Sequence, residues 1–481
     1  MEKPIGLCYA ARSWYGPLDA DMFKHIKNDH APDIKGYFIV SNDKEERYVR
    51  GLVNDETAVY INVTKYFTEH WDEFTYDKFL EIEEKYDLKP LWKYVYMDRF
   101  LIMADKEYCA QITAGYFSFY EFLFGTYDID YFYDEAISTM QTFAGYAVGP
   151  HYGVQYVSQM IARGATFDDT MHYYITEPYQ INFDIDDSHP LEYYSEEERA
   201  AAEKYLKDFE DKDIKPVCSK EALDYPHIRW NLLLCIPRFF YLLFNKPNND
   251  KHFYMYYHHH MEALYPFGNL VRYWRSKKYA VAPDYSKKFV FFPLHFQPES
   301  STLYCSPKYE KQLVAIDAIA KSLPADTFLY IKEHYQMLGK RPLSFYKELQ
   351  QYPNVVLIDP WENARIIIQH CEAVFTLTGT AGFEAFLLGK PVLLAGRTAF
   401  ETAPGIELMD DYFDKYVPFM EKWQKPTRDE QIRWLCAYMR TLYPGTVENH
   451  SDHVYSDENC RLLADSLYDY MVQNYGKFDK E

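Results

Sequence analysis

The sequence predicts an α/β protein with two lobes and a helical C-terminal tail. From Phe289 onward, short apolar runs alternate with longer amphipathic runs, which is the pattern of a repeated βα unit and of a parallel sheet. The part of the chain before Phe289 also contains strand-like runs, but helix-like runs outnumber them. A chain of 481 residues that is 48% hydrophobic and 26% charged has the composition of a folded globular protein and can bury a core in each lobe.

The first lobe is assigned to residues 1–284 and is expected to be an α/β lobe with helical insertions. The runs predicted as strands cover Gly36–Asn42 and Ala58–Val63. The runs predicted as helices cover Asp77–Tyr86, Tyr108–Phe124, Ile137–Ala147 and Ser195–Phe209. The stretch 211–284 mixes apolar helix-like runs with Pro and Asn turns, and it is interpreted as a bridge between the lobes.

The second lobe is assigned to residues 285–425 and is expected to be Rossmann-like. Its five predicted strands are short, apolar and bounded by turn or polar residues; they cover Phe289–Leu294, Thr327–Ile331, Asn354–Ile358, Ala373–Leu377 and Pro391–Ala395. The helices predicted between them cover Lys308–Ser322, Pro342–Gln350, Trp361–His370 and Gly382–Leu388. Short connections predict parallel strands with ligands at their carboxyl ends. Residues 426–481 are predicted to be helical and could cross back to the first lobe.

The charge balance limits the classes of partner. A net charge of −21 argues against a broad nucleic-acid-binding surface, because neutralising phosphates needs an excess of cations. It does not exclude a small anionic substrate, because a few donors in one cleft can hold such a molecule. The longest apolar stretch, 231–244, is shorter than the ~20 residues that cross a bilayer. The N-terminus lacks the pattern of a secretion signal, so we expect a cytoplasmic protein.

The loop after the first strand of the second lobe concentrates chemically active side chains. His295, Gln297 and Glu299 stand directly after the predicted strand, followed by three hydroxyl residues. A proline after Gln297 favours an extended backbone there, so His295 and Gln297 can share one face. The structural alternative is a helix cap and a turn.

The loop after the second strand carries a histidine and several cations. Lys332, His334, Lys340 and Arg341 follow the strand within a short stretch. His334 can donate a hydrogen bond to a phosphate oxygen, and Lys340 or Arg341 can offset its charge. The structural alternative is a solvated charged loop.

A third loop of the second lobe joins a strand to a helix through small residues: Thr378, Gly379, Thr380, Ala381 and Gly382, with Glu384 in the first helical turn. Backbone N–H groups at a helix start can hold an anion, and Glu384 could accept hydrogen bonds from a ribose diol. The three loops emerge at one edge of the predicted sheet, and their convergence predicts a nucleotide-sugar site. No P-loop motif is present, and no GxGxxG motif follows a strand.

In these segments the chain resembles the bacterial capsule polysaccharide synthesis family, which is similar to Kdo-type glycosyltransferases of the two-lobed GT-B fold. The segments that carry the resemblance are Leu294–Glu299, Ile331–His334, Thr378–Ala385 and Gly389–Pro391. The order and spacing agree from about Phe289 to Ile406, whereas the first lobe offers only Asp98–Leu101.

The resemblance implies a glycosyltransferase whose donor is a CMP-activated 3-deoxy sugar acid such as Kdo. The second lobe would hold the nucleotide through His334 and the turn 378–384, and Gln297 and Glu299 would face the reacting sugar. A surface-polysaccharide or glycolipid acceptor would lie on the first lobe. Two departures matter: Tyr335 stands where the family often has proline, and an aspartate of related retaining members has no counterpart near Gln297, so the nucleophile is not transferred.

Several questions stay open at the level of sequence. Glu299, His295 or an acid of the first lobe could serve as the catalytic base. A sugar-nucleotide epimerase or hydrolase of the same fold, or a non-catalytic polysaccharide-assembly partner, would also fit. The segment Arg272–Lys278 is either a peripheral contact with the inner membrane or a solvated helix end. No cofactor and no metal are expected, because the adjacent histidines 258–260 point in different directions.

Overall fold

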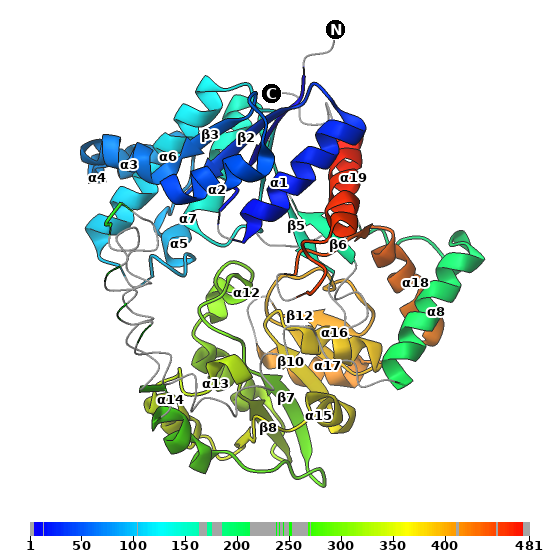
Figure 1. Cartoon of the computed structure of the whole chain (residues 1–481). Coiled ribbons are helices and arrows are strands. Elements are labelled where there is room, and N and C mark those ends of the chain that lie inside the picture. Colours follow the sequence, from blue (N-terminus) through cyan, green and yellow to red (C-terminus); the bar gives the residue numbers. More distant parts are fainter. Residues whose placement is uncertain are drawn as a thin grey trace.

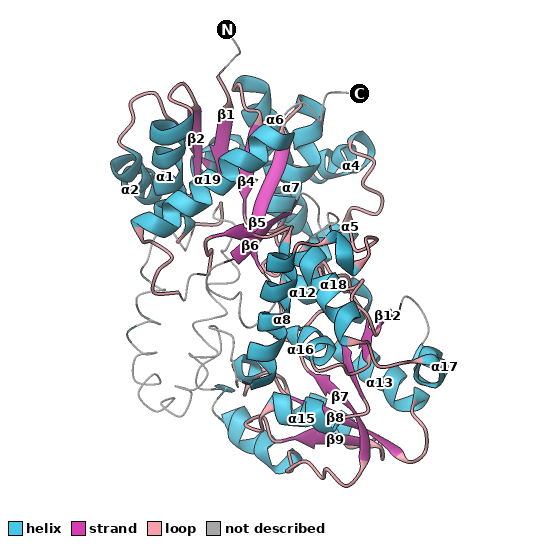
Figure 2. Cartoon of the chain, turned by 90° about the vertical axis from the view of Figure 1, so that its right-hand side faces the viewer, coloured by secondary structure: helices cyan, strands magenta, loops and turns pink. Residues whose placement is uncertain are grey.

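The computed structural model describes residues 4–474 except 13, 103, 163–170, 176–184, most of 212–267, 270, 410–412 and 449–450. The described residues form two lobes, each built around a sheet with helices on its faces (Figures 1 and 2). The predicted fold class, with two Rossmann-like lobes and a helical C-terminal end, is confirmed. Most of the predicted bridge 211–284 lies outside the described residues.

The sheet of the first lobe has the strand order β13-β6-β5-β4-β1-β2-β3. Its strands are β1 (Gly6–Tyr9), β2 (Lys35–Val40), β3 (Val59–Asn62), β4 (Tyr131–Asp134), β5 (Gln155–Ile161), β6 (Met171–Ile175) and β13 (Tyr443–Pro444). The strands β1 to β5 pair in parallel, and β6 and β13 extend the sheet in antiparallel fashion. The predicted strands match β2 and β3, and the remaining strands were not predicted.

The helices of the first lobe are α1 (Tyr15–His25), α2 (Asp43–Val53), α3 (Val63–His70), α4 (Tyr76–Lys85), α5 (Trp92–Tyr96), α6 (Lys106–Thr126) and α7 (Met140–Val148). Helix α8 (Glu196–Asp211) follows them in the chain but packs into the buried cluster that includes Phe383 of the second lobe. The predictions for α4, α6, α7 and α8 are confirmed within a few residues. Helix α7 begins later than expected because Thr139 and Thr142 form a capping box at its start.

The sheet of the second lobe has the strand order β12-β11-β10-β7-β8-β9, and all its described pairs are parallel. Its strands are β7 (Lys288–Pro293), β8 (Thr327–Lys332), β9 (Val355–Ile358), β10 (Ala373–Thr376), β11 (Val392–Leu394) and β12 (Ile406–Leu408). The five predicted strands are confirmed, and β12 was missed. The helices are α12 (Ser300–Leu303), α13 (Gln312–Ser322), α14 (Leu343–Leu349), α15 (Ala364–His370), α16 (Thr380–Leu387) and α17 (Tyr416–Lys422).

Each sheet contains a point at which the chain reverses the direction in which it adds strands. In the first lobe this point lies between β1 and β4, and in the second lobe it lies between β7 and β10. At such a switch point the loops leave the sheet in opposite directions and open a crevice at the carboxyl ends of the strands, where ligands bind in α/β proteins. The topology therefore provides two crevices, one in each lobe.

The two lobes touch through the loops at these carboxyl ends. Helix α12 lies below the first lobe in Figure 1, and Tyr304 at its end packs into the core of the first lobe. The Tyr304 hydroxyl lies 3.5 Å from the backbone oxygen of Thr139, at the start of α7. Ala136, in the loop between β4 and α7, packs against a buried cluster that includes Phe383 and Phe400 of the second lobe.

The C-terminal helices are α18 (Arg428–Met439) and α19 (Asp457–Asn474). Helix α18 packs against α8, and α19 lies along α1 (Figure 1). Buried residues of α19, including Leu463 and Leu467, belong to the same core cluster as Leu18 and Phe23 of α1. No helix in the described part of the chain is long and apolar enough to span a membrane.

Candidate active site

His295 leaves the end of β7 and reaches across the switch point to the end of β10. Its Nε2 accepts a hydrogen bond from the Leu377 N–H at 3.2 Å and lies 3.2 Å from the Thr376 hydroxyl. The ring is buried, with 8% of the residue exposed. The Nε2 lone pair accepts from the backbone in this arrangement, so His295 holds the turn that follows β10. Its role as one of the candidate bases stays a prediction.

Gln297 is also used within the protein. Its side-chain oxygen accepts a hydrogen bond from the Arg341 guanidinium at 3.1 Å, and its amide nitrogen donates to the backbone oxygen of Glu310. Both ends of the amide thus have partners within the protein, and that Gln297 faces the reacting sugar stays a prediction. Gln297 joins the loop after β7 to the loop after β8.

Arg341 forms a buried ion pair with Glu333. Its Nε lies 2.9 Å from a Glu333 carboxylate oxygen, and a second guanidinium nitrogen donates to the His295 backbone oxygen at 2.7 Å. Glu333 also accepts hydrogen bonds from the Tyr346 hydroxyl and the His334 N–H, each at 2.9 Å. Arg341 therefore holds the two loops together. That Lys340 or Arg341 offsets the charge of a phosphate stays a prediction.

Lys332 is the last residue of β8, the strand next to the edge strand β9. Burial lowers the pKa of its amine, while Glu384 of α16 and Asp359 after β9 favour the charged form. Lys340, in contrast, is exposed, with its amine 4.9 Å from the centre of the Phe296 ring. Lys332 is thus the cation best placed for a ligand in the crevice.

His334 presents a single hydrogen-bond donor to the crevice. Its Nδ1 accepts a hydrogen bond from the Gln336 N–H at 3.3 Å, so the proton of the neutral ring resides on Nε2. Burial lowers the pKa of His334 to about 4, and the nearby cations Lys332, Arg341 and Lys340 add to this effect. The ring stacks on Tyr335, with centroids 4.5 Å apart. A neutral Nε2–H is the form that donates to a phosphate oxygen.

We expect His334 to stay neutral throughout the physiological pH range. Its folded-state pKa lies below the ordinary value, so the protonated ring is disfavoured in the fold, and the stability that this contributes is lost as the pH falls from about 6.5 towards 4. NMR titration of the ring signals, assigned by comparison with His334→Gln, should place the midpoint near the lower end of this window. A midpoint near 6.5 would contradict the donor assignment.

The turn between β10 and α16 is held by contacts within the second lobe. The Thr378 hydroxyl donates to the Ser301 backbone oxygen at 3.0 Å, and the Gly379 N–H donates to the Thr376 hydroxyl at 3.1 Å. A Cβ on Gly379 would lie 2.9 Å from the Thr376 hydroxyl oxygen, and one on Gly382 would lie 3.1 Å from the Phe400 ring. Packing alone therefore favours glycine at both positions, and that they let a ligand come close stays a prediction.

The start of α16 remains open on its outer side. Thr380 is exposed, and Ala381 and Glu384 are partly exposed. The N–H groups of the first helical turn point out of the N-terminal end of the helix. The helix dipole favours an anion at this end. Glu384 lies on the same helix within the electrostatic range of Lys332. Glu384, predicted in the third loop, thus lies near Lys332, predicted in the second loop.

Glu299 stands at the start of α12, on the side of the crevice that faces the first lobe. It is partly exposed, and one carboxylate oxygen accepts a hydrogen bond from the Ser301 hydroxyl at 2.6 Å. Its backbone oxygen accepts from the N–H groups of Thr302 and Leu303. Glu299 occupies the N-cap position of α12, but its side chain makes no capping hydrogen bond to the helix backbone, and the carboxylate remains partly exposed.

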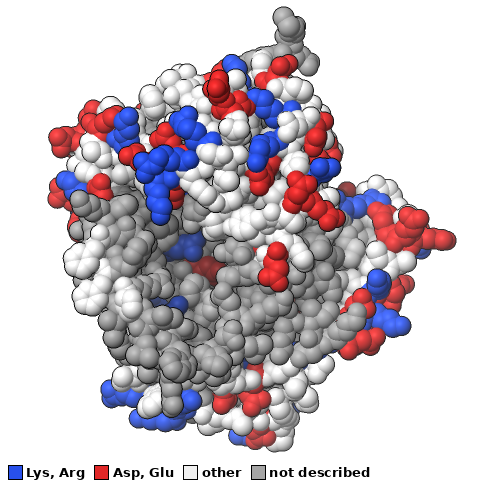
Figure 3. Space-filling model, in the orientation of Figure 1, with Lys and Arg blue, Asp and Glu red and all other residues white. Residues whose placement is uncertain are grey.

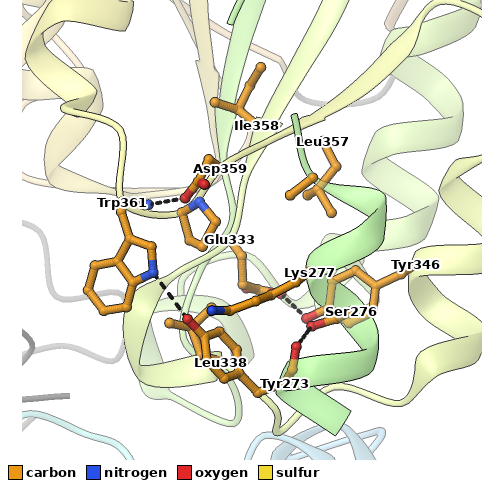
Figure 4. Close-up of a pocket in the computed structure, with 12 residues that line it drawn as sticks. Tyr273, Ser276, Lys277, Glu333, Leu338, Tyr346, Leu357, Ile358, Asp359 and Trp361 are labelled. Carbon is orange, nitrogen blue, oxygen red and sulfur yellow. Dashed lines mark hydrogen bonds between the residues drawn. The ribbon is translucent and has the colours of Figure 1, made fainter. Parts of the chain in front are cut away.

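A pocket of about 250 Å³ lies at the ends of β8 and β9 (Figure 4). Aromatic rings of Tyr273, Tyr346 and Trp361 form its walls, and the Trp361 indole N–H donates to the Tyr273 hydroxyl at 3.2 Å. Asp359 accepts a hydrogen bond from the Trp361 N–H at 2.9 Å at its rim. The volume is below the ~300 Å³ at which pockets for drug-sized ligands begin, so it suits one aromatic ring system.

The sequence did not identify this pocket, although Trp361 closely follows a predicted strand. Tyr273, Ser276 and Lys277 of the basic and aromatic segment line the pocket, and Arg272 donates to the Gly339 backbone oxygen at 2.8 Å. One face of this segment is therefore part of the site, whereas Trp274 is 63% exposed. Among the described residues no group of three His, Cys, Asp or Glu side chains could hold a metal ion, and 258–260 lies outside them.

One family of known proteins matches part of the chain. Residues 248–417 match the family described as "Capsule polysaccharide biosynthesis protein", so the resemblance seen in the sequence is confirmed over that segment. The match contains all three loops and the pocket. A search of curated proteins gave no match.

Solved structures with a similar course of the chain include two transferases and an epimerase. The KpsC β-Kdo 2,7 transferase of Thermosulfurimonas dismutans is 11% identical, with 96% of this chain and 99% of that chain covered and a TM-score of 0.36. The KpsC β-Kdo 2,4 transferase of the same organism is 12% identical, with 69% and 87% covered and a TM-score of 0.35. The UDP-GlcNAc 2-epimerase of Methanocaldococcus jannaschii is 10% identical, with 90% and 98% covered and a TM-score of 0.29.

Proposed function

We propose that this protein is a glycosyltransferase of surface-polysaccharide synthesis that uses a nucleotide-activated sugar, with a CMP-linked 3-deoxy sugar acid such as Kdo as donor. One observation carries the proposal. Along the carboxyl edge of the second sheet, an aromatic pocket, the Lys332 ammonium, the His334 Nε2–H and the open start of α16 follow one another. This series matches the parts of a nucleotide: a base, a ribose and a phosphate.

The phosphate end of the donor would lie beside Lys332, His334 and the start of α16. Transfer breaks the bond between the anomeric carbon and the phosphate oxygen, and negative charge develops on the departing phosphate. The buried ammonium, the neutral imidazole donor and the helix N–H groups stabilise that charge without having to reorganise. Glu384 would accept hydrogen bonds from the ribose, and the accessible carboxylate of Glu299 would face the transferred sugar.

The aromatic pocket would hold the nucleobase. Trp361 and Tyr273 provide flat apolar surfaces, and stacking on aromatic side chains stabilises bound bases by about 1–3 kcal/mol each. Asp359 lies at the rim of this pocket and interacts electrostatically with Lys332. Lys332 would therefore lie between the proposed position of the base and the proposed position of the phosphate. A small pocket favours a pyrimidine, which supports CMP as the nucleotide.

Thermal melting in the presence of CMP, UDP or GDP tests the donor assignment. A ligand that binds only the folded protein stabilises it by about 2.7 kcal/mol at one hundred times its dissociation constant, so CMP should raise the melting temperature of the wild-type protein. Trp361→Ala should remove most of this rise, whereas Trp274→Ala, a change at an exposed indole of the adjacent segment, should retain it. A rise with UDP alone would overturn the choice of CMP.

Incubation with CMP-Kdo separates transfer from the other functions that the fold allows. Transfer to a labelled Kdo oligosaccharide would support the proposed reaction. Release of CMP that does not depend on the acceptor would instead support a hydrolase, and conversion of the donor sugar without transfer would support an epimerase. Binding of CMP without any turnover would support a non-catalytic partner in polysaccharide assembly. Peripheral contact of the protein with the inner membrane through Arg272–Lys278 stays a prediction.

A further inference from the structure

The switch point of the first lobe holds a compact group of charged side chains that the proposed donor site does not use. Arg12 lies in the loop after β1. Asp134 is the last residue of β4, and Glu135 comes directly after it. The Arg12 guanidinium lies 2.7 Å from an Asp134 carboxylate oxygen and 2.9 Å from a Glu135 carboxylate oxygen. The Tyr15 and Ser138 hydroxyls donate to Glu135 at 3.3 and 3.2 Å. This group therefore occupies the crevice where the topology predicts a ligand.

Several buried polar atoms in this group and next to it lack a hydrogen-bond partner. Among the described residues, one carboxylate oxygen each of Asp134 and Asp19 and the hydroxyls of Tyr9 and Tyr120 have no hydrogen-bond partner. Asp134 and Asp19 are 4% and 2% exposed. Burial raises the pKa of both carboxyl groups. Buried polar atoms without partners are rare in native proteins, and at a crevice they indicate a place for a polar ligand or ordered water.

Glu135 is the acid of this group that reaches the surface. Its side chain is 24% exposed, compared with 1% for Asp134 and 11% for Arg12. Asp98, another buried acid of the first lobe, has no exposed surface and caps the N–H groups of Phe100 and Leu101. Among these acids, therefore, only Glu135 combines an anchored carboxylate with access to a ligand.

The Glu135 loop faces the second lobe. Ala136, the next residue, packs on the cluster that contains Phe400, and the Phe400 ring also packs against Gly382 at the start of α16. Three residues further along the loop, Thr139 meets Tyr304 of the second lobe. In the space-filling view, basic and acidic atoms are visible inside a hollow between the two lobes (Figure 3). The first-lobe crevice thus opens towards the candidate donor site.

We propose that Glu135 is the catalytic base for the acceptor, and that Arg12 and Asp134 are positioning residues that hold its carboxylate. This inference rests on the proposed glycosyltransferase function. The acceptor hydroxyl would lie against Glu135, with a second polar group of the acceptor, or an ordered water, at the unpartnered oxygen of Asp134. As the acceptor oxygen bonds to the anomeric carbon, its proton passes to Glu135. The anomeric carbon–oxygen bond to the phosphate breaks, and CMP leaves with the electron pair.

Full-length variants tested with CMP-Kdo and a labelled Kdo oligosaccharide distinguish this role from a structural one. Glu135→Gln keeps the shape and most hydrogen bonds but cannot take a proton, so its kcat should fall by roughly 10²–10⁴-fold. The rise in melting temperature with CMP should equal that of the wild type, because the donor site is untouched. Glu69→Gln, an equivalent change at an exposed acid of the first lobe, should behave as the wild type.

Two further variants separate the base from the residues that position it. Glu135→Ala should regain part of its kcat with added formate, because a small carboxylate can occupy the vacated space. Asp134→Asn should lower kcat without changing the KM for CMP-Kdo, and formate should not restore it, because the Glu135 carboxylate is still present. Rescue of Asp134→Asn by formate would contradict the division of roles.

The outcomes also separate this inference from the function on which it rests. If the wild type neither transfers Kdo nor responds to CMP, the proposed function fails and this inference fails with it. If the wild type transfers Kdo and Glu135→Gln stays within about threefold of it, well short of the loss that removing a general base causes, only the assignment of Glu135 is overturned. A product with retained anomeric configuration would also overturn it, because a single displacement assisted by a base inverts that centre.

Discussion

Replacement of Arg341 by methionine is expected to destabilise the protein more than any other single change considered for the second lobe. Glu333 is 2% exposed, and the Arg341 guanidinium is its ion-pair partner. Removing one member of a buried ion pair leaves the other charge without compensation, which costs about 3–5 kcal/mol. The midpoint of urea unfolding, followed by tryptophan fluorescence, should fall accordingly, because Trp361 lines the same pocket as Glu333.

The double variant Arg341→Met with Glu333→Gln provides the matched control. It removes the charge on both sides, and the amide introduced at position 333 can still accept from the Tyr346 hydroxyl, as the Glu333 carboxylate does at 2.9 Å. Much of the lost stability should therefore return. If the double variant is no more stable than Arg341→Met alone, the lost contacts of Arg341 with His295 and Gln297, and not the uncompensated charge of Glu333, account for the loss of stability.

The strands of the second lobe could be predicted because their local signals are complete. Each is a short apolar run with a polar or turn residue at both ends, and each is buried in the sheet. Strand β12 was missed because its three residues, Ile406–Leu408, include a glutamate and are only partly buried. In the first lobe, β1 and β4 were missed, although β3, which has the same length of four residues, was predicted.

The site could be predicted only to the level of which loops converge. Sequence spacing showed that several cations follow β8, but it could not show that Arg341 folds back onto Glu333 while Lys332 remains in the crevice. The pairing depends on the path of the loop, which Tyr346 and His295 fix from outside it. The same applies to Glu135: the sequence suggested only an unidentified acid of the first lobe, because the contact of Glu135 with Arg12, more than one hundred residues away, depends on the pairing of β1 with β4.

Replacement of Lys332 by methionine is expected to produce the largest loss of nucleotide binding. Methionine has a similar length and an apolar chain, so it fits the largely buried position. The change removes the cation and leaves the negative charges of Glu384 and Asp359 facing the phosphate without compensation. Losing a charged hydrogen bond to the phosphate costs about 1.5–3 kcal/mol, and the affinity for CMP, measured by calorimetry, should fall by roughly 10- to 150-fold.

Lys340→Met is the control for this prediction, because it removes the same charge from an exposed position in the same loop. A change in long-range attraction alone would weaken CMP binding similarly in both variants and would disappear at high salt, because surface charges are screened within about 10 Å at 0.1 M salt. If Lys332 contacts the phosphate directly in the crevice, the binding of CMP to Lys332→Met should remain weak at high salt. It also predicts that Lys332→Met with Glu384→Gln binds CMP better than Lys332→Met alone, since one uncompensated negative charge beside the phosphate is then gone. Equal losses for Lys332→Met and Lys340→Met at all salt concentrations would move the phosphate out of the crevice and to the surface of the loop.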